Sequence, residues 1–444
     1  MTSAPTQAAP TLIRWQGDIA RLEPDDRRAL FDRTTSADDA VRERTAGIIA
    51  RVRRDGDRAL RELATELDGA ALDVLEVPRV AWRQALDRLA PELRRAMERA
   101  ATNIQAVHRA FMPIARETES EPGILVGRRP DPLGRVGVYA PGGRAAYPSS
   151  LLMGVLPARV AGVGEIVVCS PPARDTGRPS DVVLAAAALA DADRLFSLGG
   201  AGAIAALAYG TETVPLVDRI VGPGNAYVAE AKIQVSSVVA IDSPAGPSEL
   251  LVLCDETADP SLVARELLAQ AEHDPLAAVV AVTVSAALAR DIVREVARQL
   301  GSQPRAAIIS TALAARGGVL VAASLAEAIS FANSYAAEHL LLVVRDPDDV
   351  LRELRNAGTI FVGASASVAF GDYMTGANHV LPTGGLARSY SGLSTLDFVR
   401  WTSWQRVTPA AAAGLSVDVG TFADAEGLPG HAAAARAWTT EAAG

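Results

Sequence analysis

The sequence predicts an α/β protein with two Rossmann-like domains, each a parallel sheet flanked by helices, and small helical segments at both ends. Two series of short apolar runs alternate with helical segments, which is the pattern of such sheets. Glycine pairs follow two of the runs, Gly142-Gly143 and Gly199-Gly200, where open α/β sheets bind ligands, although the same pairs would suit tight turns alone. No Gly-x-Gly-x-x-Gly follows a strand, so the usual dinucleotide fingerprint is absent.

The first series is expected to contain strands Val136–Tyr139, Glu165–Cys169, Arg194–Leu198 and Val217–Val221, separated by helices Ser149–Ala161, Val182–Ala190 and Ala201–Tyr209. The second is expected to contain strands Glu249–Cys254, Ala277–Val284, Ala306–Ser310, Leu340–Val344 and Thr359–Val362, with helices Pro260–Glu272, Ala286–Leu300, Leu325–Tyr335 and Pro347–Arg355.

These elements predict four parts of the chain. Residues 1–35 are expected to form an arm or a short helical segment. Residues 36–138, helical to about Met112, are expected to join residues 249–392 in a discontinuous main α/β domain. Residues 139–248 form the second α/β domain, and residues 393–444 an alanine-rich helical tail.

Composition excludes several classes of protein. The net charge is 43 − 52 = −9, which argues against nucleic acid as the main partner. No apolar run reaches the roughly 20 residues of a membrane span, and no signal peptide is visible at the N-terminus. Cys169 and Cys254 each end an apolar run and are expected to be buried strand residues. A Schiff base would depend on Lys232, the only lysine. We expect a cytoplasmic protein.

Four of the five histidines, all but His108, stand near carboxylates or amides. Gln270 and His273 are three residues apart on an expected helix, so that both can reach one ion, and Asp372 and His431 are the natural further ligands. Such a set suits zinc or a similar divalent ion, whereas a polar face on a core helix is the alternative. Glu338-His339 could transfer protons beside the metal, or be an ordinary solvated helix end.

The chain resembles the histidinol dehydrogenase family from about residue 36 to 440. The motifs that carry the resemblance are Val136-Gly-Val-Tyr-Ala-Pro-Gly-Gly143, Ala206-Leu-Ala-Tyr-Gly-Thr-Glu212, Val217-Asp-Arg-Ile-Val-Gly-Pro-Gly-Asn-Ala-Tyr227, Ala245-Gly-Pro-Ser-Glu249, Gln270-Ala-Glu-His-Asp-Pro275, Glu338-His-Leu340, Asn356-Ala-Gly358, Gly371-Asp-Tyr373, Asn378-His-Val-Leu-Pro-Thr383 and Glu426-Gly-Leu428 with His431.

The resemblance implies an NAD- and zinc-dependent, four-electron oxidation of L-histidinol to L-histidine through bound histidinal. It implies that residues 139–248 bind NAD, and that the tail reaches the partner subunit of a homodimer with a shared site. The implied roles are zinc ligation by Gln270, His273, Asp372 and His431; acid/base catalysis by Glu338 and His339; substrate contact by Ser248, His379 and Glu426 together with the ligands and His339; and NAD contact by Tyr139 and Asn225.

Gly202 departs from the family pattern. The family has Gly-Gly-Ala-Gln-Ala-Ile with the glutamine on NAD, whereas this chain has Gly199-Gly-Ala-Gly-Ala-Ile204. Loss of the amide removes a polar contact worth about 1 kcal/mol. The alternatives are a paralogue that oxidises another alcohol, for example a sulfonated diol, a zinc hydrolase with Glu338 as base, and a binding module without activity.

Overall fold

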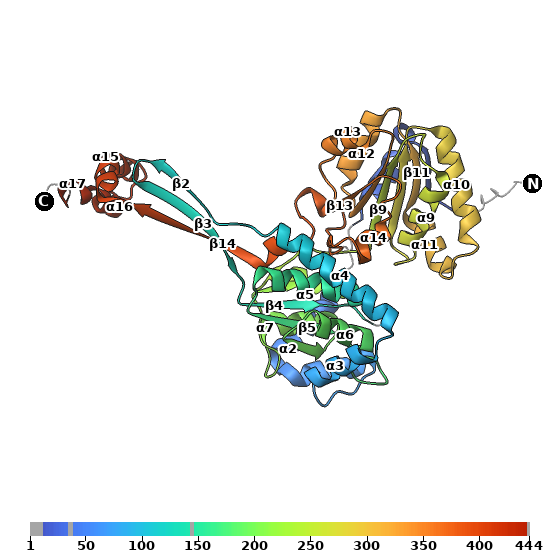
Figure 1. Ribbon diagram of the computed structural model, residues 1–444, viewed down its shortest axis with the longest axis horizontal. Helices are drawn as coiled ribbons and strands as arrows, with labels where there is room; N and C mark the ends of the chain where they lie inside the picture. Colours follow the sequence, from blue (N-terminus) through green and yellow to red (C-terminus); the bar gives the residue numbers. More distant parts are fainter. Residues whose placement is uncertain (1–11, 34–38, 143–145, 442–444) are drawn as a thin grey trace, which may run out of the picture.

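The computed structural model describes residues 12–33, 39–142 and 146–441, and Gly143 of the predicted glycine turn lies outside them. Within these residues one sheet has six parallel strands in the order β1-β11-β10-β9-β12-β13 (Figure 1). The strands are β1 (Trp15–Asp18), β9 (Glu249–Cys254), β10 (Ala278–Thr283), β11 (Gly317–Val321), β12 (His339–Val343) and β13 (Thr359–Val362).

Both faces of this sheet are covered. The helices are α1 (Pro24–Phe31), α9 (Pro260–Ala271), α10 (Ala286–Leu300), α11 (Ala306–Arg316), α12 (Leu325–Tyr335), α13 (Pro347–Glu353) and α14 (Val368–Tyr373). Alternate residues of β9 separate the two cores: Leu250 and Val252 pack with α9, α10 and α11, whereas Leu251 and Leu253 pack with α1, α12 and α13.

The second sheet has five parallel strands in the order β6-β5-β4-β7-β8 within the described chain. They are β4 (Arg135–Tyr139), β5 (Glu165–Ser170), β6 (Arg194–Ser197), β7 (Arg219–Val221) and β8 (Ala240–Ile241). The helices around it are α2 (Asp39–Leu63), α3 (Arg79–Arg88), α4 (Pro91–Ala110), α5 (Pro148–Ala161), α6 (Asp181–Leu189), α7 (Gly200–Tyr209) and α8 (Ala226–Val235). The predicted pair of parallel-sheet α/β units is therefore confirmed.

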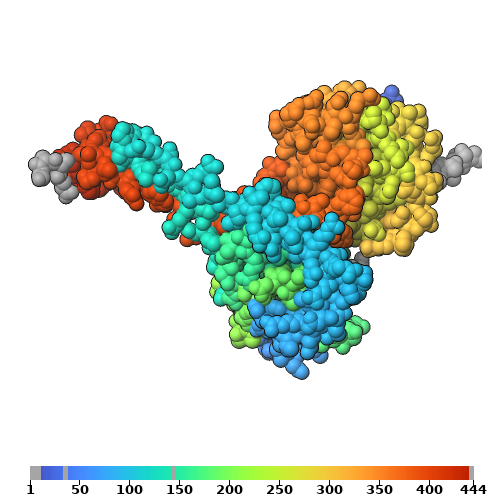
Figure 2. Space-filling model, viewed as in Figure 1, coloured from blue at the N-terminus to red at the C-terminus, as the bar shows by residue number. Residues whose placement is uncertain are grey.

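A third, antiparallel sheet forms an arm that projects from the two α/β units (Figures 1 and 2). Its strands are β2 (Arg116–Glu121), β3 (Ile124–Pro132) and β14 (Val399–Val407), and its tip carries α15 (Pro409–Ala425), α16 (Pro429–Arg436) and α17 (Trp438–Glu441). Short 3-10 helices at Ile19–Arg21, Leu386–Arg388 and Thr395–Phe398, and a π-helix at Ala64–Asp68, complete the described elements.

The grouping of residues 36–138 differs from expectation. Their described helices α2, α3 and α4 pack on the five-stranded sheet, not with residues 249–392. Residues 116–132 belong to the arm and not to either α/β core. An amphipathic pattern predicts that a helix packs on an apolar core. It does not predict which of two sheets supplies that core, because either sheet offers an apolar face.

Three further expectations are corrected. The described part of the N-terminal segment is no arm, since β1 pairs with β11 and Trp15 is buried, whereas the predicted short helical segment is present as α1. Residues 306–310 are helical, because a short apolar run has no period that separates strand from buried helix. The tail beyond residue 393 is only partly helical, since β14 pairs along its length with β3, and Trp404 packs over Gly127. No helix in the described ranges is long and apolar enough to cross a membrane.

Candidate functional site

Glu338 and His339 lie at the amino edge of the six-stranded sheet, where β12 begins beside β9. Both are buried, with 6% and 3% of their surfaces exposed. The Glu338 carboxylate accepts a hydrogen bond of 2.7 Å from the backbone N–H of Glu249. The Glu249 carboxylate accepts one of 3.3 Å from the N–H of Glu338. The predicted proton-transfer pair is therefore part of the core and not a solvated helix end.

The His339 ring has a defined orientation. Its Nδ1 lies 3.0 Å from the Glu249 carbonyl oxygen, which can only accept, so Nδ1 carries a proton. Its buried Nε2 has no hydrogen-bond partner among the described residues and lies 3.6 Å from Asp372 Oδ1. Burial lowers the pKa of His339, but the Glu338 and Asp372 carboxylates outweigh it and raise the pKa to about 10.

Three of the four candidate metal ligands lie at, or just beyond, the ends of two helices. The Glu266 carboxylate in α9 accepts a hydrogen bond of 3.1 Å from the backbone N–H of Val368, which fixes the start of α14 beside α9. One turn further along α9 and α14 are Gln270 and Asp372, with His273 just beyond α9. Burial raises the pKa of Asp372, but His339, and to a lesser extent His379 and His273, outweigh it and lower the pKa below its usual value.

The two α/β units meet at His379. Its Nδ1 donates to the Asp372 carbonyl oxygen at 2.9 Å, and its Nε2 lies 3.2 Å from Ser150 Oγ at the start of α5. Burial lowers the pKa of His379, so the neutral ring can accept a hydrogen bond from the serine hydroxyl. Ser248, another predicted substrate residue, directly precedes Glu249 and β9.

Glu426 and His431 lie apart from these residues. Glu426 follows α15 and His431 is in α16, both exposed at the tip of the arm (Figure 1). The described residues contain no group of three or more histidine, cysteine or acidic side chains that could hold a metal. One copy of the chain thus places Gln270 and His273 at the end of α9, which is joined to the start of the helix that carries Asp372, but leaves His431 remote at the tip of the arm.

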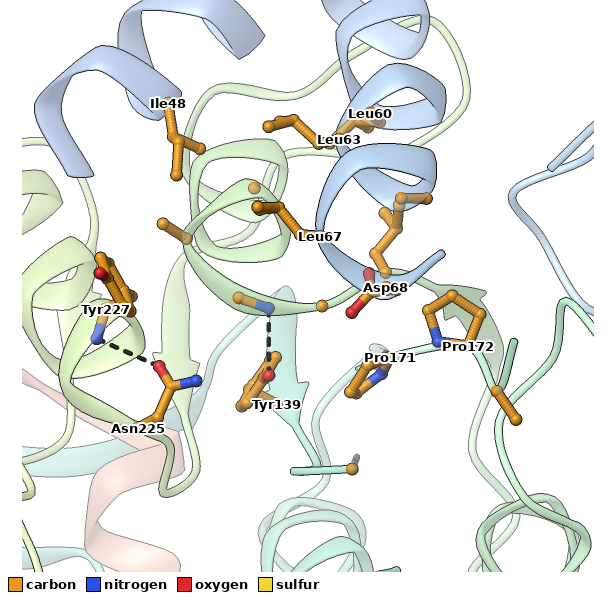
Figure 3. A pocket seen from close by; sticks show the side chains of 18 of the residues that line it. Ile48, Leu60, Leu63, Leu67, Asp68, Tyr139, Pro171, Pro172, Asn225 and Tyr227 are labelled. Atoms are coloured by element: carbon orange, nitrogen blue, oxygen red, sulfur yellow. Dashed lines mark hydrogen bonds between the residues drawn. The ribbon is translucent and has the colours of Figure 1, made fainter. Parts of the chain in front are cut away.

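Tyr139, Gly202 and Asn225 line one cavity of about 560 Å³ at the carboxyl edge of the five-stranded sheet (Figure 3). The Tyr139 hydroxyl accepts a hydrogen bond of 3.1 Å from the N–H of Gly200 at the start of α7. Asn225 caps α8, since its Oδ1 accepts from the N–H groups of Tyr227 and Val228 at 3.1 and 3.2 Å. The opposite wall is apolar and comes from α2 and the residues after it: Ile48, Leu60, Leu63 and Leu67.

Comparison with known proteins shows the family. Residues 31–438 match the family model described as histidinol dehydrogenase. The chain belongs to the histidinol dehydrogenase family. It is 51% identical over 416 residues to histidinol dehydrogenase of Halobacterium salinarum, covering 94% of this chain and 97% of that protein. It is 49% identical over 356 residues to that of Methanosarcina barkeri, covering 80% and 82%.

A crystal structure of histidinol dehydrogenase from Elizabethkingia anophelis superimposes with a TM-score of 0.93 at 32% identity. The superposition covers 98% of this chain and all of that one, arm included. As a member of the histidinol dehydrogenase family, this protein is an oxidoreductase.

Several residues at the site were not predicted. Ser150 contacts His379, Glu249 contacts Glu338 and His339, and Arg33 contacts Glu249, each across more than 80 residues of sequence. Asp68 lines the cavity, and burial raises its pKa to about 6. Of these residues, only Glu249 could have been recognised from the sequence. It lies in one of the histidinol dehydrogenase motifs and is a glutamate at the start of an otherwise apolar strand.

Neither cysteine is expected to take part in chemistry. Both are buried, and burial raises the pKa of Cys254 to about 12 and that of Cys169 further still. We expect Ellman's reagent to label neither thiol in the folded protein and both in denaturant, with enzyme activity unchanged by the native treatment. Rapid labelling of the folded protein would contradict this expectation.

Proposed function

We propose that this protein oxidises L-histidinol to L-histidine through bound histidinal, in the last steps of histidine biosynthesis, with zinc and NAD as cofactors. The single observation that carries the proposal is the buried Glu338–His339 pair, whose free Nε2 faces Asp372 in a chain that matches histidinol dehydrogenases along its length. The cytoplasmic location stays a prediction.

The residues present fit a zinc ion. Gln270 offers an amide oxygen, His273 an imidazole and Asp372 a carboxylate, and neither Gln270 nor the His273 ring has a side-chain hydrogen bond among the described residues. His431 would be the fourth ligand. Zinc held by these residues would supply a Lewis acid that orients the substrate, and it would offset the Asp372 charge that favours protonation of His339.

The cavity around Tyr139 and Asn225 is the proposed NAD site, since it lies at the carboxyl edge of a parallel sheet beside a glycine-rich helix start. NAD held there beside Tyr139 and Asn225 would supply the hydride acceptor for each of the two oxidations. With neutral His339, Nε2 takes the hydroxyl proton as the alcohol becomes the aldehyde.

Glu338 then assists addition of water to the bound aldehyde. One of its carboxylate oxygens is held by the Glu249 N–H, which leaves the other to take a proton from water. The protonated His339 returns its proton to the carbonyl oxygen as the hydrate forms, and Glu338 releases the proton it took from water to solvent. His339, neutral again, takes the hydroxyl proton of the hydrate in the second oxidation, which gives the acid. Ser248, His379 and Glu426 are proposed to hold the substrate through both steps, so that the reactive amino-aldehyde is not released.

We propose a homodimer in which the arm of one subunit completes the site of the other. The exposed position of His431 and Glu426 at the arm tip supports this. So does the exposed apolar surface of α15, where Val417 and Phe422 are 59% and 72% exposed.

The direct test uses zinc-loaded protein with L-histidinol and excess NAD. We expect two NADH for each histidine formed, and loss of activity with a chelator or in His339→Ala. Production of NADH from another alcohol but not from histidinol would overturn the substrate and indicate the paralogue. Turnover of a hydrolase substrate without NAD would indicate the zinc hydrolase.

A mixing experiment tests the shared site. His431→Ala and His339→Ala should each be inactive, but co-refolded mixtures should recover about a quarter of wild-type activity, since half the dimers are mixed and each has one intact site. A mixture of His339→Ala with Asp372→Ala is the control and should recover nothing, because both residues come from the same subunit. No recovery in the first mixture, with dimers formed, would refute sharing.

Gly202 offers a test of the cavity. An added Cβ would lie 3.3 Å from Leu63 Cδ1, the end of a flexible side chain, so a longer residue can be accommodated. We expect Gly202→Gln to lower KM for NAD about fivefold, the effect of one hydrogen bond. Gly202→Leu, of similar size but without the amide, should not lower it. Equal KM values in the two variants would contradict an amide contact with NAD.

A further inference from the structure

The Glu249 carboxylate is the most heavily bonded buried acid beside the proposed acid/base pair. Its Oε2 accepts from Arg33 Nη1 at 2.7 Å and from the Glu338 N–H at 3.3 Å, and its Oε1 accepts from the Gly384 N–H at 2.7 Å. The side chains of Arg33 and Glu249 are 1% and 2% exposed. A pair buried this completely loses its hydration, so it persists only where its hydrogen bonds are made.

Arg33 is fixed on a second side by Tyr335. Its guanidinium lies 3.6 Å from the centre of the Tyr335 ring and also donates to the Tyr335 carbonyl oxygen. Tyr335 ends α12, three residues before Glu338. Arg33 thus connects the N-terminal segment both to the start of β9 and to the chain that leads into β12.

The same residue, Glu249, fixes the His339 ring through its main chain. Its carbonyl oxygen accepts from Nδ1–H, and its N–H donates to the Glu338 carboxylate. All three polar groups of Glu249 therefore contact either Glu338 or His339. Any rotation of Glu249 would move both members of the pair.

We propose that Arg33 and Glu249 are positioning residues for the acid/base pair: Arg33 holds the Glu249 carboxylate, and Glu249 holds Glu338 and keeps His339 protonated at Nδ1 so that Nε2 is the base. This inference rests on the proposed function of Glu338 and His339. Burial raises the pKa of Glu249 to about 7, although Arg33 opposes the shift. Without Arg33 the Glu249 carboxyl group would hold a proton. One of its two oxygens, each of which accepts a backbone N–H, would then become a hydroxyl donor.

The first test compares kinetics. In Glu249→Gln and Arg33→Met we expect kcat to fall about tenfold or more, with KM for histidinol and NAD within about twofold, as for loss of acid/base alignment. Arg33→Lys should recover part of kcat. Glu76→Gln is the matched control, because it breaks the Arg194–Glu76 pair, with contacts of 3.0 and 2.6 Å, on the five-stranded sheet. It should reduce thermal stability without changing kcat.

The second test does not need activity. With only five histidines, the Nδ1–H resonance of His339 can be assigned in ¹⁵N-histidine-labelled protein by its loss in His339→Ala. We expect slow exchange of this proton in the wild type and in Glu76→Gln, and fast exchange in Glu249→Gln and Arg33→Met.

Unchanged exchange and kcat in folded Glu249→Gln and Arg33→Met would overturn the positioning role. A fall in kcat no greater than that of Glu76→Gln at matched stability would overturn it as well. If the wild type does not oxidise histidinol but the exchange behaves as expected, the proposed function fails and the positioning stands.

Discussion

The buried carboxylates of Glu249 and Glu338 are the constraint on which the rest of the site depends. They begin neighbouring parallel strands in a region with almost no solvent, and each accepts the backbone N–H of the other. Two buried anions side by side repel one another unless cations lie close. Arg33 supplies one positive charge and His339 can supply another. This explains why Arg33, His339 and the two acids pack in one cluster.

This cluster lies at the amino edge of its sheet, opposite to the usual ligand site of open α/β sheets. The carboxyl ends of α9 and α14 explain this position, because these helices return to the amino edge and place Gln270 and Asp372 there. The five-stranded sheet uses its carboxyl edge, where Tyr139 and Asn225 line the cavity. Ser150, just beyond that edge, contacts His379. The carboxyl edge of the five-stranded sheet therefore meets the amino edge of the six-stranded sheet at this contact.

The tip of the arm exposes a set of residues whose exposure a single copy of the chain does not explain. Its tip exposes Val417, Val419 and Phe422, yet it also carries Glu426 and His431, which are polar and exposed. Exposed apolar surface beside potential ligands suits contact with another protein surface better than contact with water. The fold thus separates residues that the proposed chemistry requires together.

The sequence by itself determined which side chains could do chemistry. Helical spacing predicted Gln270 and His273 as a pair of ligands for one ion, although His273 lies just beyond α9, and adjacency paired Glu338 with His339, because both patterns are local. The alternation of strands and helices likewise predicted two parallel sheets, and β13 was placed at its observed bounds.

Only the tertiary structure decided what surrounds those side chains. Arg33 and Glu249 are 216 residues apart, and no local pattern joins them. Whether α2, α3 and α4 pack on one sheet or the other depends on long-range complementarity between apolar faces, as does the pairing of β14 with β3. The burial that orients His339 and shifts its pKa exists only once both strands are packed side by side.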